Sequence, residues 1–216
     1  MTHNKRIPAP KHYPITRKQN TYVSTIKGSR SREDAIPTVL LLRDVLEYAE
    51  TEKEAKKIVK DGKILRNGEP VKDIKEGIGI LDIVEIPETE ETFRAVRKGK
   101  YLEFLPVNDD KVAAKVLDKE LEDGEFVYRL HNGENYRTKD EFDTDSTLIF
   151  KDGVEELKLE EGAGVLVTGG KHAGETAELE EINSRGMKGK TGRVKNDTEF
   201  ETPLENLVAV NGLEVS

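Results

Sequence analysis

Regular alternation of apolar and polar residues begins near residue 38. Over residues 39–49, apolar residues recur at the three- and four-residue spacing of a helix, with charged residues between them. A second helix is expected from Thr51, where Thr51 and Glu54 form a capping box. Its apolar face is formed by Ala55, Ile58 and Val59. Gly62 then stands where a glycine commonly ends a helix.

Most of the remaining pattern predicts strands. The expected strands cover residues 63–66, 79–86, 93–97, 101–107, 126–131, 135–138, 147–150, 154–159 and 165–167, with another starting at 176 and a last one within 202–210. Asn-Gly or Asp-Gly pairs at Asn67, Asn132 and Asp152 mark turns beside them. One further helical turn is expected over residues 111–114, capped by Asp109 or Asp110. The pattern predicts an α+β, multi-domain chain.

Composition fits a folded protein with much charged surface. The chain has 216 residues, of which 35% are hydrophobic and 36% charged, which suits two or three compact units. It has no cysteine, so disulfides and thiolate metal sites are excluded. No stretch approaches the roughly 20 apolar residues of a membrane helix, and the N-terminus lacks an apolar signal core. We expect a cytoplasmic location.

The charges are sorted along the chain. The net charge is −8, yet residues 1–32 contain eight basic residues and no acidic residue, so all 43 acidic residues follow. A basic arm on an acidic body can hold a polyanion locally while the body stays soluble. A salt-rich cell interior would also favour an acidic surface.

The basic arm has an unusual composition. Pro8, Pro10 and Pro14 disfavour a helix and favour extended backbone. His12, Tyr13 and Tyr22 stand between the basic residues and could stack on bases. A disordered tail is the alternative for such a composition.

Residues 38–87 resemble a small RNA-binding module shared by several ribosomal proteins, pseudouridine synthases and tyrosyl-tRNA synthetases. The match runs through LRDVL, then T-x-K-E-A-K-K-x-V-x-x-G-x-I-L-x-N-G, then D-I-V-E-I. In that family, the second helix and the loop after it place basic side chains on folded RNA. The resemblance assigns this role to Lys53, Lys56, Lys57 and Lys60, with Arg43 and Arg66 nearby. Lysines that are merely solvated are the alternative.

The arm itself carries the most specific short motif. KRIPAPKHYPI resembles the opening of the archaeal and eukaryotic type of small-subunit ribosomal protein four, through Lys5, Arg6, Ala9, Pro10, Lys11, His12 and Tyr13. That family has a β domain in its middle, and RLHNGENY here is similar to its usual hairpin.

Near the C-terminus, VLVTGGKHAGET resembles the KOW motif, the first hairpin of a small SH3-like barrel in ribosomal proteins and elongation factors. Its glycines allow positive φ at the hairpin tip, so the loop can lie against RNA. Lys171 and His172 are the expected contacts. A glycine-rich hairpin without a ligand is the alternative. The basic stretch that follows contributes Arg185, Lys188 and Lys190.

No catalytic or metal-binding pattern stands out. SRGMKGKT lacks the first glycine of a phosphate-binding P-loop and follows a polar segment. The four histidines have no metal-ligand spacing. We therefore expect no enzymatic activity, no cofactor and no metal.

Taken together, these resemblances imply a structural constituent of the small ribosomal subunit. Its expected parts are a basic arm (1–37), a two-helix module (38–87), a central β domain (88–160) and a KOW barrel (161–216). Expected partners are small-subunit ribosomal RNA and neighbouring ribosomal proteins, with no membrane and no small-molecule substrate. Arg17 and Lys18 complete the expected RNA contacts. A KOW-containing transcription elongation factor or an RNA-modification accessory protein is the alternative.

Overall fold

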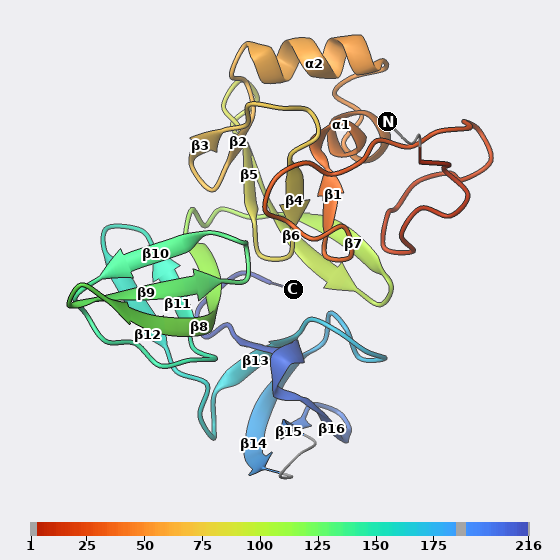
Figure 1. Cartoon of the computed structure of the whole chain (residues 1–216). Helices are drawn as coiled ribbons and strands as arrows, with labels where there is room; N and C mark the ends of the chain where they lie inside the picture. Colours follow the sequence, from red (N-terminus) through yellow and green to blue (C-terminus); the bar gives the residue numbers. More distant parts are fainter. Residues whose placement is uncertain (1–3, 185–188, 216) are drawn as a thin grey trace. The chain divides into compact units, whose positions relative to one another are not determined.

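The computed structural model describes residues 4–184 and 189–215. The chain forms two compact units (Figure 1). The N-terminal unit comprises Met1–Val96 and Lys100–Asn108, and the C-terminal unit comprises Arg97–Gly99 and Asp109–Ser216. The described residues are mostly β, with short helices near the N-terminus, so the predicted α+β class is confirmed.

The two predicted helices are present in the N-terminal unit. The first begins as α1 (Thr38–Leu40), continues as the π-helix η1 (Leu41–Val45) and is shorter than expected. It ends before Glu47, whose φ of 59° is incompatible with helix. The second is α2 (Glu52–Lys60), where the Glu54 N–H donates to Thr51 Oγ1 at 3.3 Å, as the capping box predicts. Gly62, with φ of 68°, follows its end.

Two sheets accompany these helices. One pairs β1 (Ala35–Pro37) with β4 (Gly77–Gly79). The other has the order β3 (Glu69–Pro70), β2 (Leu65–Arg66), β5 (Ile83–Ile86), β6 (Glu91–Lys98) and β7 (Tyr101–Pro106). The continuous strand predicted over residues 79–86 is wrong. Leu81 adopts a φ of 65°, and Asp82 accepts a hydrogen bond from the Gly79 N–H at 2.7 Å, so the chain turns between β4 and β5.

The C-terminal unit contains two five-stranded sheets. The first has the order β10 (Asn135–Thr138), β9 (Glu125–Leu130), β8 (Val112–Glu122), β11 (Thr147–Phe150) and β12 (Val154–Leu157). The helical turn predicted over residues 111–114 is wrong, because residues 112–114 begin β8. Val112 pairs with Phe150 and Ala114 with Leu148, so strand pairing overrides the local capping signal.

The second sheet has the order β16 (Glu199–Pro203), β15 (Lys190–Lys195), β14 (Thr176–Ser184), β13 (Gly164–Val167) and β17 (Leu207–Ala209). A short 3₁₀-helix, η3 (Leu204–Asn206), connects β16 to β17. The last strand returns to pair antiparallel with β13. Val165, Val167, Leu179, Val194, Leu204 and Leu207 form the buried core of this sheet.

A buried lysine joins the two sheets of the C-terminal unit. Lys115 lies on β8, and its Nζ donates to the carbonyl oxygens of Leu204 and Leu207, each at 2.8 Å. A longer contact of 3.3 Å reaches the carbonyl oxygen of Glu205. The side chain is 3% exposed. The η3 turn is thereby fixed to the middle of β8.

Candidate nucleic-acid interface

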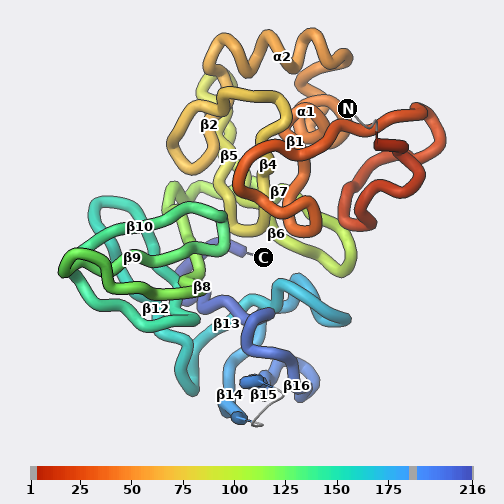
Figure 2. Tube along the Cα trace, viewed as in Figure 1, coloured from red at the N-terminus to blue at the C-terminus, as the bar shows by residue number. Residues whose placement is uncertain are grey.

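Three of the arm residues expected to contact RNA are buried in the N-terminal unit. Arg6 donates through Nη2 to Asp44 Oδ1 at 2.6 Å and through Nε to the Thr16 carbonyl oxygen at 2.5 Å. His12 Nε2 lies 3.1 Å from the Ala35 carbonyl oxygen. The Tyr13 ring packs edge-on against His12, and burial raises the pKa of Tyr13 to about 12. These side chains hold the arm beside α1 and β1 (Figure 2).

Other residues of the arm are lysines whose charged side chains are exposed to solvent. Lys5, Lys11 and Lys18 are exposed and have no ion pair within residues 4–184 and 189–215. Arg17 instead cross-links the arm, donating to the carbonyl oxygens of Ala9 at 2.6 Å and Pro10 at 2.8 Å. Of the three rings considered for base stacking, Tyr22 is 57% exposed, whereas His12 and Tyr13 are buried. Cations and one ring therefore remain on the surface.

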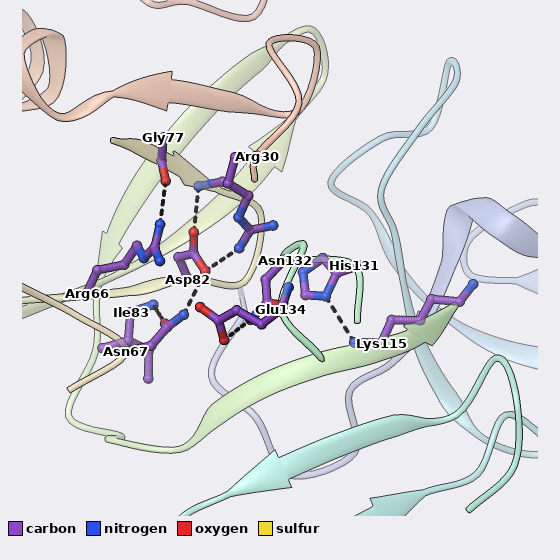
Figure 3. Close-up of polar contacts among 11 residues, drawn as sticks. Arg30, Arg66, Asn67, Gly77, Asp82, Ile83, Lys115, His131, Asn132 and Glu134 are labelled. Carbon is purple, nitrogen blue, oxygen red and sulfur yellow. Dashed lines mark hydrogen bonds and ion pairs between the residues drawn. The ribbon is translucent and has the colours of Figure 1, made fainter. Parts of the chain in front are cut away.

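A second anchor ties the arm to the two-helix module. Arg30 and Asp82 form a buried ion pair, their side chains 3% and 2% exposed. Asn67 Nδ2 donates to the same carboxylate at 2.9 Å, and Figure 3 shows Arg30 and Asn67 approaching Asp82 from separate segments. Arg66 donates to the Gly77 carbonyl oxygen at 3.0 Å, and Arg43 pairs with Asp44 at 2.7 Å. Both predicted arginines thus take part in intramolecular contacts.

The four lysines of α2 are exposed, and none has an ion pair within the described part of the chain. Successive helical residues are rotated by about 100°, so the four side chains share one face of α2. Lys53 and Lys57 are not among the residues that line the neighbouring hollow. Lys56 and Lys60 line a hollow of about 640 Å³ between α2 and residues 72–75.

Lys27, Lys72 and Lys75 also line this hollow, and sequence reasoning missed them. The signal was present in the charged segment VKDIKEG, residues 71–77. Its lysines were not assigned because a lysine-rich turn by itself is ordinary solvated surface. Their place beside α2 depends on the folding of the chain.

Of the two RNA contacts expected in the glycine-rich loop after β13, one is exposed to solvent and the other is half-buried. Lys171 is exposed, and no ion pair is recorded for it within the described residues. His172 is half-buried, because its ring stacks on Phe200 with centroids 4.0 Å apart. His172 Nδ1 also lies 3.1 Å from the Glu175 carboxylate. Lys190 is exposed at the start of β15, whereas Arg185 and Lys188 lie outside the described residues.

The same loop contacts Arg97–Gly99, a short segment that belongs to the C-terminal unit. The Gly99 N–H donates to the Ala173 carbonyl oxygen at 2.8 Å. A Cβ added at Gly174 would lie 2.0 Å from the Arg97 carbonyl oxygen. This close approach requires glycine and fixes the position of the loop.

Gly174→Ala should therefore lower the free energy of unfolding of the C-terminal unit by about 2–4 kcal/mol, because a backbone clash adds to the strain of a φ of 93°. Gly170→Ala is the matched control, since its φ of 83° is similar but a Cβ there meets nothing within 4 Å. Its cost should be about 1–2 kcal/mol of backbone strain. Urea unfolding measures both, and equal losses would show that the clash is not the cause.

The described residues hold neither a membrane-spanning helix nor a cluster of metal ligands. None of the helices in those residues is both long and apolar enough to span a membrane. No group of three or more His, Asp or Glu residues within residues 4–184 and 189–215 is arranged to hold a metal ion.

Comparisons with known proteins identify relatives of the whole chain. A scan against protein-family models finds no match. The small ribosomal subunit protein eS4 of Archaeoglobus fulgidus is 34% identical, covering 98% of this chain and 87% of the relative. The protein of the same name from Methanocaldococcus jannaschii is 33% identical, covering 86% of this chain and 83% of the relative. The solved structure of the 30S ribosomal protein S4e from Thermoplasma acidophilum has a TM-score of 0.70 at 21% identity, covering 82% of this chain and 95% of that chain, and shows the same fold.

These relatives are structural proteins of the archaeal ribosome, a cytoplasmic class without enzymatic activity. The chain belongs to the small ribosomal subunit protein eS4 family. The family predicted from the KRIPAPKH arm is thereby confirmed, together with the expected structural role. The comparisons do not favour the transcription-factor or RNA-modification alternatives.

Proposed function

We propose that this protein binds small-subunit ribosomal RNA as a structural component of the small ribosomal subunit. The contacts come from the arm, from α2 and from the glycine-rich loop of the last sheet, which we assign as a KOW barrel. The four-part layout with boundaries at residues 37, 87 and 160 belongs to this proposal. Neighbouring ribosomal proteins are the other proposed partners.

The observation that carries the proposal is a set of exposed lysines without ion pairs in the described residues. The set comprises Lys5, Lys11, Lys18, Lys53, Lys56, Lys57, Lys60, Lys171 and Lys190. Several other lysines are paired with carboxylates, as Lys63 is with Glu88 at 2.8 Å and Lys151 with Asp110 at 2.7 Å. Lysines that lack such a partner can replace the counterions of a phosphate backbone.

The buried arm residues support binding in a different way. Arg6, His12 and Tyr13 position the arm, so that Lys5, Lys11 and Lys18 are presented from a folded segment. An ordered segment loses less conformational entropy on binding than a disordered tail does. Arg17, Arg43 and Arg66 act through the same kind of positioning.

Replacing Lys5, Lys11 and Lys18 with glutamine should weaken binding to small-subunit ribosomal RNA. The dependence of log K on log salt should become shallower by about one unit for each lysine that contacts a phosphate. Filter binding at several salt concentrations measures both effects. Substitution is preferable to deletion of the arm, because deletion would also remove the buried anchors Arg6 and Arg30.

The matched control replaces three exposed lysines that already have carboxylate partners, Lys63, Lys151 and Lys158. The control alters the net charge equally and should change the salt dependence little. Equal effects of the two triple variants would contradict the proposal. Failure of the unmodified protein to bind would also contradict it.

A further inference from the structure

The glycine-rich loop after β13, residues 168–174, is held at its start by η3. The Thr168 N–H donates to the Asn206 carbonyl oxygen at 2.8 Å, and Thr168 Oγ1 donates to the same oxygen at 3.1 Å. Gly169 lies against the Asn206 side chain, because a Cβ added at Gly169 would be 2.5 Å from Asn206 Oδ1. The first residues of the loop therefore take their position from η3.

Both ends of the loop also meet at Val167, the last residue of β13. The loop leaves β13 there, and at its other end the Gly174 N–H donates to the Val167 carbonyl oxygen at 2.7 Å. Val167 itself pairs with Leu207, the first residue of β17, which directly follows η3. A shift of the junction between η3 and β17 would therefore move the whole base of the loop.

This junction is held by Lys115, which lies on β8 in the other sheet of the C-terminal unit. Its Nζ donates to the carbonyl oxygens of Leu204 and Leu207, each at 2.8 Å, and lies 3.3 Å from that of Glu205. An ammonium group has three N–H donors, so these carbonyl oxygens use its full capacity. The Lys115 backbone N–H donates to His131 Nδ1 at 3.0 Å, and Figure 3 shows the side chain extending away from that contact.

We propose that Lys115 is a positioning residue for RNA binding, because it fixes the η3–β17 junction that in turn fixes the loop presenting Lys171. The proposal rests on the proposed RNA-binding function and adds a residue that does not itself reach RNA, since the Lys115 side chain is 3% exposed. Lys171 is exposed, so the direction of its charge depends on the conformation of the loop. A loop already held in place loses less conformational entropy on binding.

Lys115→Met tests the structural link in the free protein. Methionine keeps most of the side-chain volume but cannot donate, so η3 loses its hydrogen bonds to β8. The amide hydrogens of Thr168 and Gly174 should then exchange about tenfold faster or more, because the loop opens locally. Unchanged exchange of these amides would overturn the proposal.

The matched control for lost stability is Leu148→Ala. Leu148 pairs with Ala114, the residue before Lys115, so its side chain lies on the opposite face of the same sheet. The substitution leaves a cavity in the core of that sheet, away from η3. It should leave the exchange of the loop amides and the affinity for RNA unchanged. Equal effects of Leu148→Ala and Lys115→Met would overturn the proposal, since they would reflect lower stability alone.

Thr168 provides a second pair of variants that does not alter Lys115. Thr168→Val removes the hydrogen bond from Oγ1 to the Asn206 carbonyl oxygen at nearly the same volume, whereas Thr168→Ser keeps it. The valine variant should speed exchange at Gly174 by about threefold or more, and the serine variant should not. Equal exchange in the two variants would overturn the link between η3 and the loop, even if Lys115→Met did not fold.

Binding to an in vitro transcribed small-subunit ribosomal RNA tests the functional link. Lys171→Gln and Lys115→Met should each lower the affinity by about three- to tenfold at low salt, and each should reduce the slope of log K against log salt by about one. The double variant should lose no more than Lys171→Gln alone, because both changes remove the same contact.

The double variant separates the two proposals. Additive losses would overturn the positioning role of Lys115 while leaving Lys171 as an RNA contact. Unchanged affinity of Lys115→Met, with a loss for Lys171→Gln, would do the same. Unchanged affinity of Lys171→Gln would overturn the proposed contact of the loop with RNA, and the positioning role with it. Failure of the unmodified protein to bind would overturn the proposed function itself.

Discussion

Arg30→Ala should lower the free energy of unfolding of the N-terminal unit by about 3–5 kcal/mol. The substitution leaves the Asp82 carboxylate buried without its cation, although the Gly79 N–H and Asn67 Nδ2 still donate to it. Two hydrogen bonds do not replace a full positive charge in a site that is 2% exposed to water. Chemical denaturation followed by circular dichroism measures the loss.

Arg32→Ala is the control for this prediction. Arg32 lies two residues away in the same segment and is exposed, so its removal should cost less than about 0.5 kcal/mol. A double-mutant cycle with Asp82→Ala isolates the pair, since the double variant should lose less than the sum of the single variants. A small loss for Arg30→Ala alone would mean that water enters the site and solvates Asp82.

Lys115→Ala should destabilise the C-terminal unit by about 2–4 kcal/mol. The substitution removes the Lys115 Nζ hydrogen bonds to the carbonyl oxygens of Leu204 and Leu207 and leaves a cavity beside β8. Lys115→Met fills much of that cavity, so its loss should be smaller. Hydrogen exchange should show the η3 segment opening in both variants. If the methionine variant were as stable as the unmodified protein, the lysine would contribute nothing net.

The pH dependence of stability tests the same site. Burial lowers the pKa of Lys115, although the Asp145 carboxylate acts in the opposite direction. Between this lowered pKa and the ordinary value, the unfolded chain binds a proton that the folded chain does not, so stability increases with pH. The unmodified protein should therefore gain stability relative to Lys115→Met as the pH rises across that interval. A constant difference would mean that the pKa of Lys115 is the same in both states.

Local signals predicted much of the fold. The Thr51 cap, the glycine after α2 and the hairpins at Asn132 and Asp152 depend on residues close in sequence, and each is present. Strand β8 was missed because Asp109 and Asp110 precede a short run that also fits a capped helix. The start of β8 pairs with β11, which lies more than 30 residues away along the chain.

Burial of charged residues was the main limit on predicting the site. Arg6 and His12 have the composition of surface residues, and their partners Asp44 and Ala35 are 38 and 23 residues away. No residue close to Arg6 or His12 in the sequence indicates that these contacts will form. Lys72 and Lys75 show the converse, because folding places these ordinary surface residues beside the lysines of α2.

The pairing of β17 with β13 has a consequence for synthesis of the chain. Val165 and Val167 pair with Ala209 and Leu207, which leave the translating ribosome some 40 residues later. During that interval one edge of β13 has unsatisfied backbone groups next to an apolar sequence. Such an edge invites pairing with other nascent chains. A pause in translation between these segments would therefore favour aggregation, and a chaperone that shields this edge would protect the emerging protein.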